Sequence, residues 1–204
     1  MRGKKLPARG TADVRALLIC ALFFICGGVF GVMAAMSAEP GETWSKELLD
    51  SLSGLYSGPP GERIGSSLSC ALRYCVLLLL SGFSVLGTAF VPLLSAVRGF
   101  TLSFSALVTA TAFGDRGAFT ALALYGPEAM VTVPCFFVLA VRALSASARL
   151  FRMSTGGGDP GPLPVYNRDY FAGFLVCAAV LALYALADAC FLGMVVRMAS
   201  HWAV

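Results

Sequence analysis

The chain has 204 residues, of which 58% are hydrophobic and 13% are charged, and its mean hydropathy is +0.81. Soluble domains average about 25% charged residues, so this composition excludes a soluble globular protein and predicts an integral membrane protein. The formal net charge of +4 comes from basic residues scattered at the ends of apolar runs. Nucleic-acid binding requires them clustered on one face, so we expect the lipid bilayer and no nucleic acid as a partner.

Five apolar segments predict an all-α fold, a polytopic membrane protein with about five transmembrane helices and Gly/Pro-interrupted central segments, since a span needs roughly 20 apolar residues. We expect one integral-membrane domain over residues 1–204. The expected spans are about 16–38, 72–94, 99–113, 118–141 and 170–196. The first run is longer than the h-region of a cleavable signal peptide, which favours an uncleaved span, although the sequence MAAMSA leaves cleavage open.

The polar segment 39–69 separates the first two spans and is predicted to contain an amphipathic helix over about 42–56. Its apolar residues recur at helical spacing and therefore share one face. They are Trp44, Leu48, Leu52 and Leu55. Two compatible interpretations stay open: a helix resting on the membrane surface, or a docking face for an extracytoplasmic partner.

The distribution of charges predicts the orientation of the chain. Residues before the first span are rich in Lys and Arg, residues 39–69 are acidic overall, and Arg142, Arg149 and Arg152 follow the fourth span. Because basic residues accumulate on the cytoplasmic side, we expect a cytoplasmic N-terminus and an extracytoplasmic C-terminus.

The most hydrophobic part of the chain contains residues that weaken helices. Gly82, Gly87 and Pro92 interrupt it, and Arg98 and Gly99 follow directly. We expect Arg98 at the cytoplasmic interface, where a long side chain can extend to water.

A second topology is open for the centre of the chain. The third span is short, and Gly126-Pro127 is expected to break the fourth. Residues 99–125 would then form a re-entrant hairpin, with a full helix starting near Glu128, as in the mid-membrane sites of transporters. The charge distribution disfavours this version, because it moves Arg149 to the outside.

Two acidic residues lie deep in apolar segments. Glu128 follows Gly126-Pro127, and Asp188 lies near the middle of the last span, where an ionised carboxylate costs about 2.5–3.5 kcal/mol. Each either bonds a neighbouring helix, for example Asp188 with Arg142, or belongs to an ion or proton path. Gly27 and Gly31 form a GxxxG pair, which leaves homo-oligomerisation and packing within the chain both open.

Motifs for catalysis and cofactor binding are not evident. The sequence lacks HExxH, GxSxG and a glycine-rich phosphate loop, and its seven cysteines lack metal-binding spacing. We therefore expect no enzyme, no catalytic residue, no cofactor and no metal.

The central segment resembles the stage II sporulation protein M family, in which a Gly-x-Ser-x-x-Gly run precedes a proline and then a basic residue with Gly-Phe. The matching residues here are Gly82, Ser84, Gly87, Pro92, Arg98-Gly99-Phe100 and Phe104. Further similar features are Gly27 to Gly31, Pro127-Glu128-Ala129 with Pro134, a loose echo of a serine stretch at Ala143 to Ala148, and Asp188-Ala189. Glu128 and Ala129 depart from the amide or His-Gly forms that the family usually has after this proline.

The resemblance implies a role in engulfment at the sporulation septum of the bacterial cell membrane. It implies a non-enzymatic membrane scaffold that recruits two peptidoglycan-degrading proteins, a lytic transglycosylase (protein D) and an amidase/endopeptidase (protein P). The alternative is a small transporter or channel subunit that uses Asp188 and Glu128 in an intramembrane polar site.

Overall fold

The computed structural model describes residues 9–37, 60–112, 117–155 and 168–202, and within these ranges the chain is helical apart from two short turns. The helices are α1 (Arg9–Ser37), α3 (Pro60–Gly82), α4 (Gly87–Ala112), α5 (Gly117–Ser154) and α6 (Arg168–Trp202). Four of them contain stretches long and apolar enough to cross a membrane. They are Asp13–Ser37, Gly87–Thr111, Gly117–Ser154 and Tyr170–Ala187, and α3 adds a shorter apolar stretch, Leu72–Gly82. The prediction of an all-α polytopic membrane protein is therefore confirmed. The predicted helix 42–56, with Trp44, Leu48, Leu52 and Leu55, lies outside the described residues.

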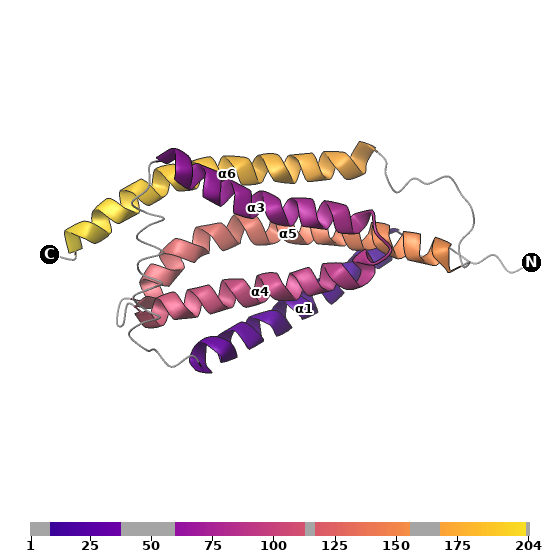
Figure 1. Cartoon of the computed structure of the whole chain (residues 1–204), viewed down its shortest axis with the longest axis horizontal. Coiled ribbons are helices and arrows are strands. Elements are labelled where there is room, and N and C mark those ends of the chain that lie inside the picture. The colour runs from indigo at the N-terminus through magenta and orange to yellow at the C-terminus, as the bar shows by residue number, and fades with distance from the viewer. Residues whose placement is uncertain (1–8, 38–59, 113–116, 156–167, 203–204) are drawn as a thin grey trace, which may run out of the picture.

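Helix α5 is the centre of the bundle and contacts each of the other four helices. Figure 1 shows α1 and α4 on one side of α5 and α3 and α6 on the other. Successive helices run in opposite directions, so one end of the bundle holds the turn 83–86 and the other holds the connection 113–116. We name these the turn end and the far end.

The contiguous hydrophobic core gathers towards the turn end. Its buried members include Leu78 of α3, Val91 and Leu94 of α4, and Leu139 and Ala143 of α5. Much of the remaining apolar surface is exposed, for example Leu86 at 78% and Met130 at 81%. Such a surface fits a bilayer, which solvates apolar side chains and leaves close packing to hold the helices together.

The segment 72–94, which we predicted as one span, is divided by a turn at residues 83–86. The turn is closed by Ser84 N–H bonding to the Ser81 carbonyl and Gly87 N–H bonding to the Ser84 carbonyl, both at 3.1 Å. The prediction of one continuous helix over 72–94 is therefore wrong. The sequence did not reveal the turn, because an apolar turn between two helices has the same hydropathy as a continuous span. Since α4 already starts at Gly87, Pro92 lies inside it.

Helix α5 is continuous over 38 residues and includes both Pro127 and Pro134. The predicted break at Gly126-Pro127 is therefore wrong, and so is a helix start near Glu128. The re-entrant alternative for 99–125 does not fit, because residues 87–112 and 117–154 form two long helices, α4 and α5. Proline is tolerated in a membrane helix when neighbouring helices and local adjustments satisfy the freed carbonyl groups.

The backbones of helices α1 and α4 lie in direct contact, because both helices carry glycines where they cross. A Cβ atom at Gly27 would meet the backbone of Ala96, and one at Gly99 would meet the Phe24 carbonyl. A Cβ atom at Gly31 would likewise meet the backbone of Phe100. The GxxxG pair is therefore used within the chain, which was one of the two predicted roles.

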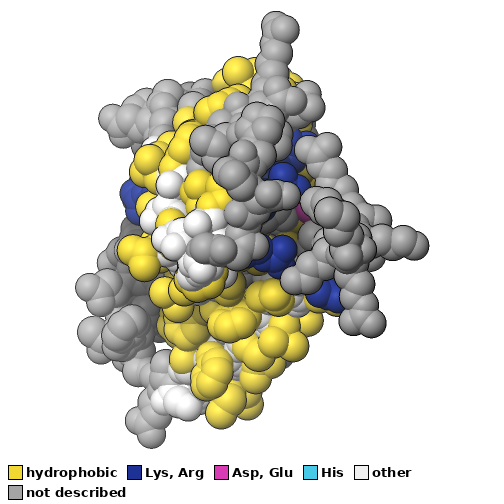
Figure 2. Space-filling view, turned by 90° about the vertical axis from the view of Figure 1, so that its right-hand side faces the viewer, with side chains coloured by type: hydrophobic (Ala, Val, Ile, Leu, Met, Phe, Trp, Pro, Cys, Tyr) yellow, Lys and Arg dark blue, Asp and Glu magenta, His cyan; other side chains and the backbone are white. Residues whose placement is uncertain are grey.

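Exposed arginines gather at the turn end, where Figure 2 shows basic side chains beside apolar surface. Arg15, Arg149 and Arg152 are exposed there, and the carboxylate of Asp13 accepts a hydrogen bond from Ser145 at 3.1 Å. The loop order thus agrees with the predicted charge asymmetry. That the turn end faces the cytoplasm stays a prediction.

A glycine substitution tests the α1–α4 contact. We expect Gly27→Ala to destabilise the protein, because the new methyl group must push two helix backbones apart, and overpacking costs about 1–3 kcal/mol. Gly126→Ala is the matched control, since a Cβ atom there would make only ordinary contacts with Leu122. Thermal unfolding in detergent measures both, and equal midpoints for the two variants would contradict the contact.

Candidate functional site

The predicted site residue Arg98 lies near the middle of the bundle. It is eleven residues into α4, about 16 Å along the axis from Gly87, and its residue is only 9% exposed. The prediction that it sits at the cytoplasmic interface is wrong. The physical reason is the turn at 83–86, which assigns residues 87–94 to α4 and so moves Arg98 inward by about two helical turns.

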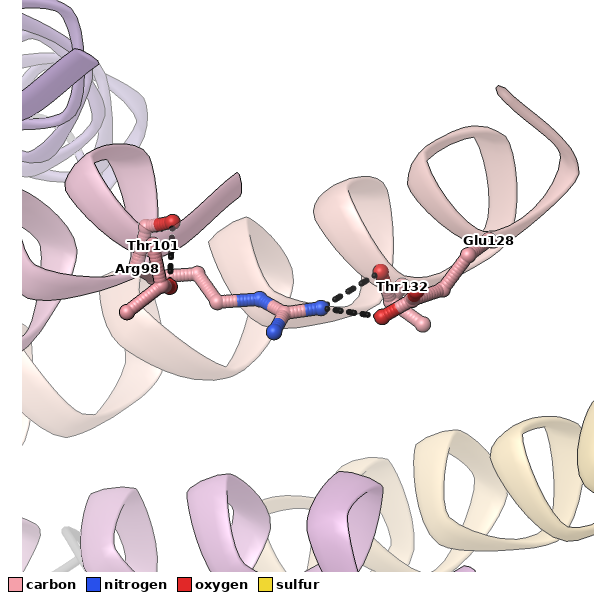
Figure 3. Close-up of polar contacts among 4 residues, drawn as sticks. All are labelled: Arg98, Thr101, Glu128 and Thr132. Carbon is pink, nitrogen blue, oxygen red and sulfur yellow. Dashed lines mark hydrogen bonds and ion pairs between the residues drawn. The ribbon is translucent and has the colours of Figure 1, made fainter. Parts of the chain in front are cut away.

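The positive charge of Arg98 is compensated by the carboxylate of Glu128 on α5. Its Nη2 donates to Glu128 Oε1 at 2.9 Å and to Thr132 Oγ1 at 3.1 Å. Figure 3 shows the guanidinium extending from α4 to these two side chains, while Thr101 Oγ1 bonds back to the Arg98 carbonyl. Glu128 and Thr132 are four residues apart and therefore share one face of α5.

A third helix completes the surroundings of the guanidinium. The ring of Tyr74, on α3, faces the Arg98 Cζ atom at 4.9 Å from the ring centre. A cation over an aromatic face gains about 2 kcal/mol when it is desolvated. Arg98 thus joins α3, α4 and α5 at one depth in the bundle.

The pair is asymmetric in its exposure, with 11% of the Arg98 side chain and 34% of the Glu128 side chain accessible. A lone charge in the hydrocarbon region is costly, and opposite charges there pair with one another. Removing one member of a buried pair leaves the other charge uncompensated, which costs more than removing both. The arrangement therefore supplies a fixed, neutral polar contact inside an apolar bundle.

A second polar contact holds the turn 83–86 against α5. Ser147 Oγ donates to the Ser84 carbonyl at 2.8 Å and lies 3.0 Å from Thr88 Oγ1. A Cβ atom at Gly87 would meet the Ser81 carbonyl and Ser147 Oγ. At the other edge of the turn, a Cβ atom at Gly82 would meet the hydroxyl of Tyr170 on α6. A side chain at position 87 would therefore collide with backbone, whereas one at position 82 would displace the end of the Tyr170 side chain.

The structure unites some predicted residues and separates others. Arg98 and Glu128 form one site, and Pro127 precedes Glu128 on an exposed position of α5. The backbone of Asp188 belongs to α6, but its side chain lies outside the described part of the chain.

The predicted Asp188–Arg142 pair stays a prediction, because the Asp188 side chain lies outside the described residues, but the backbone positions disfavour it. The guanidinium of Arg142 lies against Gly173, where a Cβ atom would meet it. Position 188 is fifteen residues further along α6, about 22 Å along the helix axis.

Sequence reasoning did not identify three residues of the site, Thr132, Tyr74 and Ser147. Thr132 was detectable in principle, because it follows Glu128 by one helical turn. Tyr74 and Ser147 become significant only through contacts with residues far away in the sequence. Among the described residues, no group of three His, Cys, Asp or Glu side chains could hold a metal ion.

These features define the class of protein: a helical, multi-pass membrane protein whose bundle is joined by an intramembrane ion pair and by close glycine contacts. The family model of stage II sporulation protein M matches residues 20–192. The chain therefore belongs to the stage II sporulation protein M family, and the match supports a sporulation membrane protein. None of the curated proteins and none of the solved structures gives a significant match.

A double-mutant cycle measures the ion pair. We expect Arg98→Met and Glu128→Met each to lower the free energy of unfolding, because each leaves one charge unpaired in the bundle. The double variant should lose less than the sum of the two, with a coupling of about 0.5–3 kcal/mol for residues in contact. Unfolding in mixed detergent micelles gives these values, and Arg149→Met, at an exposed position, is the control. Strictly additive losses would show that the two charges do not interact.

Proposed function

We propose that this chain is a non-enzymatic membrane scaffold of the engulfment machinery, which recruits peptidoglycan-degrading enzymes to the septal membrane. One observation carries the proposal: the residues of the family pattern are engaged in packing the bundle. Gly82 abuts Tyr170, Gly87 abuts Ser147 and Gly99 abuts Phe24, while Arg98 pairs with Glu128. Because the residues of the family pattern make contacts between helices, they support an architectural role.

The partners of such a scaffold would be extracytoplasmic wall hydrolases, by resemblance proteins D and P. The segment 38–59 follows Ser37 of α1 and precedes Pro60 of α3, and these two helix ends lie at the far end of the bundle, opposite to the exposed arginines. This placement agrees with an extracytoplasmic segment if the turn end is cytoplasmic. The apolar face of its predicted helix is the docking surface that we propose.

The recruitment prediction concerns that face. Replacing Trp44, Leu48 and Leu52 with serine should reduce co-purification of wall hydrolases from cells entering sporulation, because anchoring side chains in an interface carry most of its binding energy. Co-purification in detergent followed by mass spectrometry measures the recovery.

The control for this experiment keeps the segment and changes its other face. Lys46→Ser with Asp50→Ser alters residues that a helix places opposite Trp44, and recovery should stay at the wild-type level. Unchanged recovery in a stably expressed triple variant would overturn the docking surface. Failure of the wild-type protein to recover any hydrolase would overturn the scaffold itself.

A second candidate function is a small transporter or channel subunit. It is favoured because two acidic positions lie at a similar level along the axis of the bundle. The contact between Arg142 and Gly173 gives a common reference level on α5 and α6. From it, Glu128 lies fourteen residues and position 188 fifteen residues towards the far end, about 21 and 22 Å respectively. Both acidic positions thus reach a similar level, as an intramembrane polar site requires.

The flux prediction separates this candidate from the scaffold. If Glu128 and Asp188 belong to an ion path, Asp188→Asn should abolish a flux of protons or monovalent cations that wild-type protein supports in proteoliposomes. Asp115→Asn, in the short connection between α4 and α5, serves as the control and should keep the flux. Wild-type proteoliposomes as tight as protein-free vesicles would remove the candidate.

A further inference from the structure

Arg73 of α3 is an exposed charged residue at the level of the ion pair. The ring of the next residue, Tyr74, faces the Arg98 guanidinium at 4.9 Å, and its centre lies 6.2 Å from that of the Phe136 ring on α5. Arg98 is itself the twelfth residue of the apolar stretch Gly87–Thr111, which has 25 residues. These contacts place the backbone of Arg73 near the middle of the bundle, half of the roughly 30 Å hydrocarbon core away from either surface.

The side chain of Arg73 lies on the outer side of α3. Cys75 and Leu78 belong to the buried face of this helix, at 7% and 0% exposure. Arg73 precedes Cys75 by two residues, which is more than half a turn around the helix, and it is exposed. Among the side chains that the structure describes, none pairs with Arg73, and the carboxylate of Glu128 is already engaged with Arg98. An unpaired charge on the lipid-facing side at this depth is costly, and such residues usually mark a functional contact.

The exposed residues around Arg73 have the spacing of a helix-packing surface. They follow one another at intervals of four, three and four residues, which places them on one stripe along the helix. We name them the outer stripe of α3: Ser69, Arg73, Val76 and Leu80. All four are exposed, Val76 at 51% and Leu80 at 60%. A stripe with this spacing packs against one further helix, here with two apolar residues towards the turn end and the arginine at mid-depth.

We propose that the outer stripe of α3 binds a transmembrane helix of another protein, and that a carboxylate of that helix at mid-depth pairs with Arg73. Charge complementarity selects this partner, because opposite charges in the hydrocarbon region pair with one another. A second copy of this chain fits less well, since the carboxylate of Glu128 is engaged with Arg98. The inference adds a contact inside the membrane to the docking surface outside it, and it does not depend on the proposed function.

Binding of a model transmembrane peptide tests the outer stripe. The full-length protein, with a donor fluorophore at its N-terminus, is reconstituted in phosphatidylcholine vesicles, and energy transfer to an acceptor-labelled peptide is measured. The peptide is a Leu/Ala helix of about 21 residues, which is long enough to span the bilayer, with one Asp at its centre. Two matched peptides have Asn or Leu at that central position.

We expect the wild-type protein to bind the Asp peptide about tenfold more tightly than the Leu peptide, because removing one member of a buried charge pair leaves the other unpaired. The Asn peptide should bind with intermediate strength, since it keeps a hydrogen bond and lacks the charge. Arg73→Met should lose the preference for the Asp peptide, and Arg73→Lys should keep most of it. Arg149→Met, which removes an exposed arginine at the turn end, is the control and should behave like the wild type.

Each other outcome overturns the inference. Equal binding of the Asp and Leu peptides, or equal binding of the Asp peptide to the wild type and to Arg73→Met, would show that Arg73 selects no partner. Failure of the wild type to bind the Asp peptide would show that the outer stripe faces lipid. Energy transfer between two labelled copies of the wild type, lost in Arg73→Met and unaffected by the peptide, would show a homo-oligomer in place of a different partner. Size-exclusion profiles that match the wild type establish that each variant compared is folded.

Discussion

The requirement that a charge inside the membrane be neutralised by a neighbour governs how this bundle is arranged. Arg98 lies near the middle of α4, and its charge is compensated by Glu128 of α5 at 2.9 Å. Because an unpaired charge at this depth is costly, α4 and α5 can settle only where the two side chains meet. The pair contributes less to net stability than to specificity, since an apolar pair of similar volume could pack as well. It defines which turn of α4 faces which turn of α5.

That register depends on where α4 begins, and the turn 83–86 determines this. Ser147 of α5 bonds the carbonyl of Ser84, so the turn is attached to the same helix that carries Glu128. The distance from the turn to the ion pair is then eleven residues of helix on α4. On a neighbouring face of α4, Gly99 allows the backbone of α1 to approach next to the charged residue. The resembling segment therefore encodes one connected unit, with a turn, a close contact and a charge at helical spacing.

The sequence predicted the class of fold well, because hydrophobic content depends on composition and not on detailed geometry. It failed where two structures share the same hydropathy. Residues 83–86 are as apolar as the helices on either side, so span lengths alone could not reveal the turn. The same error misplaced Arg98, since a charge that follows a complete span is expected at an interface. At Pro127 the sequence predicted a break that the structure does not have. Proline weakens helices in water, but a membrane helix accommodates it where other helices and side chains bond the freed carbonyl groups.

The sequence predicted the individual residues of the candidate site but not that they contact one another. Arg98 and Glu128 were each identified as polar residues in apolar surroundings, yet nothing in one sequence states that two charges 30 residues apart meet. Once they do, the chemistry of the site changes. An isolated glutamate in a membrane suggests an ion path, whereas a glutamate paired with arginine has no net charge to attract an ion. The packed core towards the turn end and the compensation of Arg98 by Glu128 therefore favour a structural role for this site.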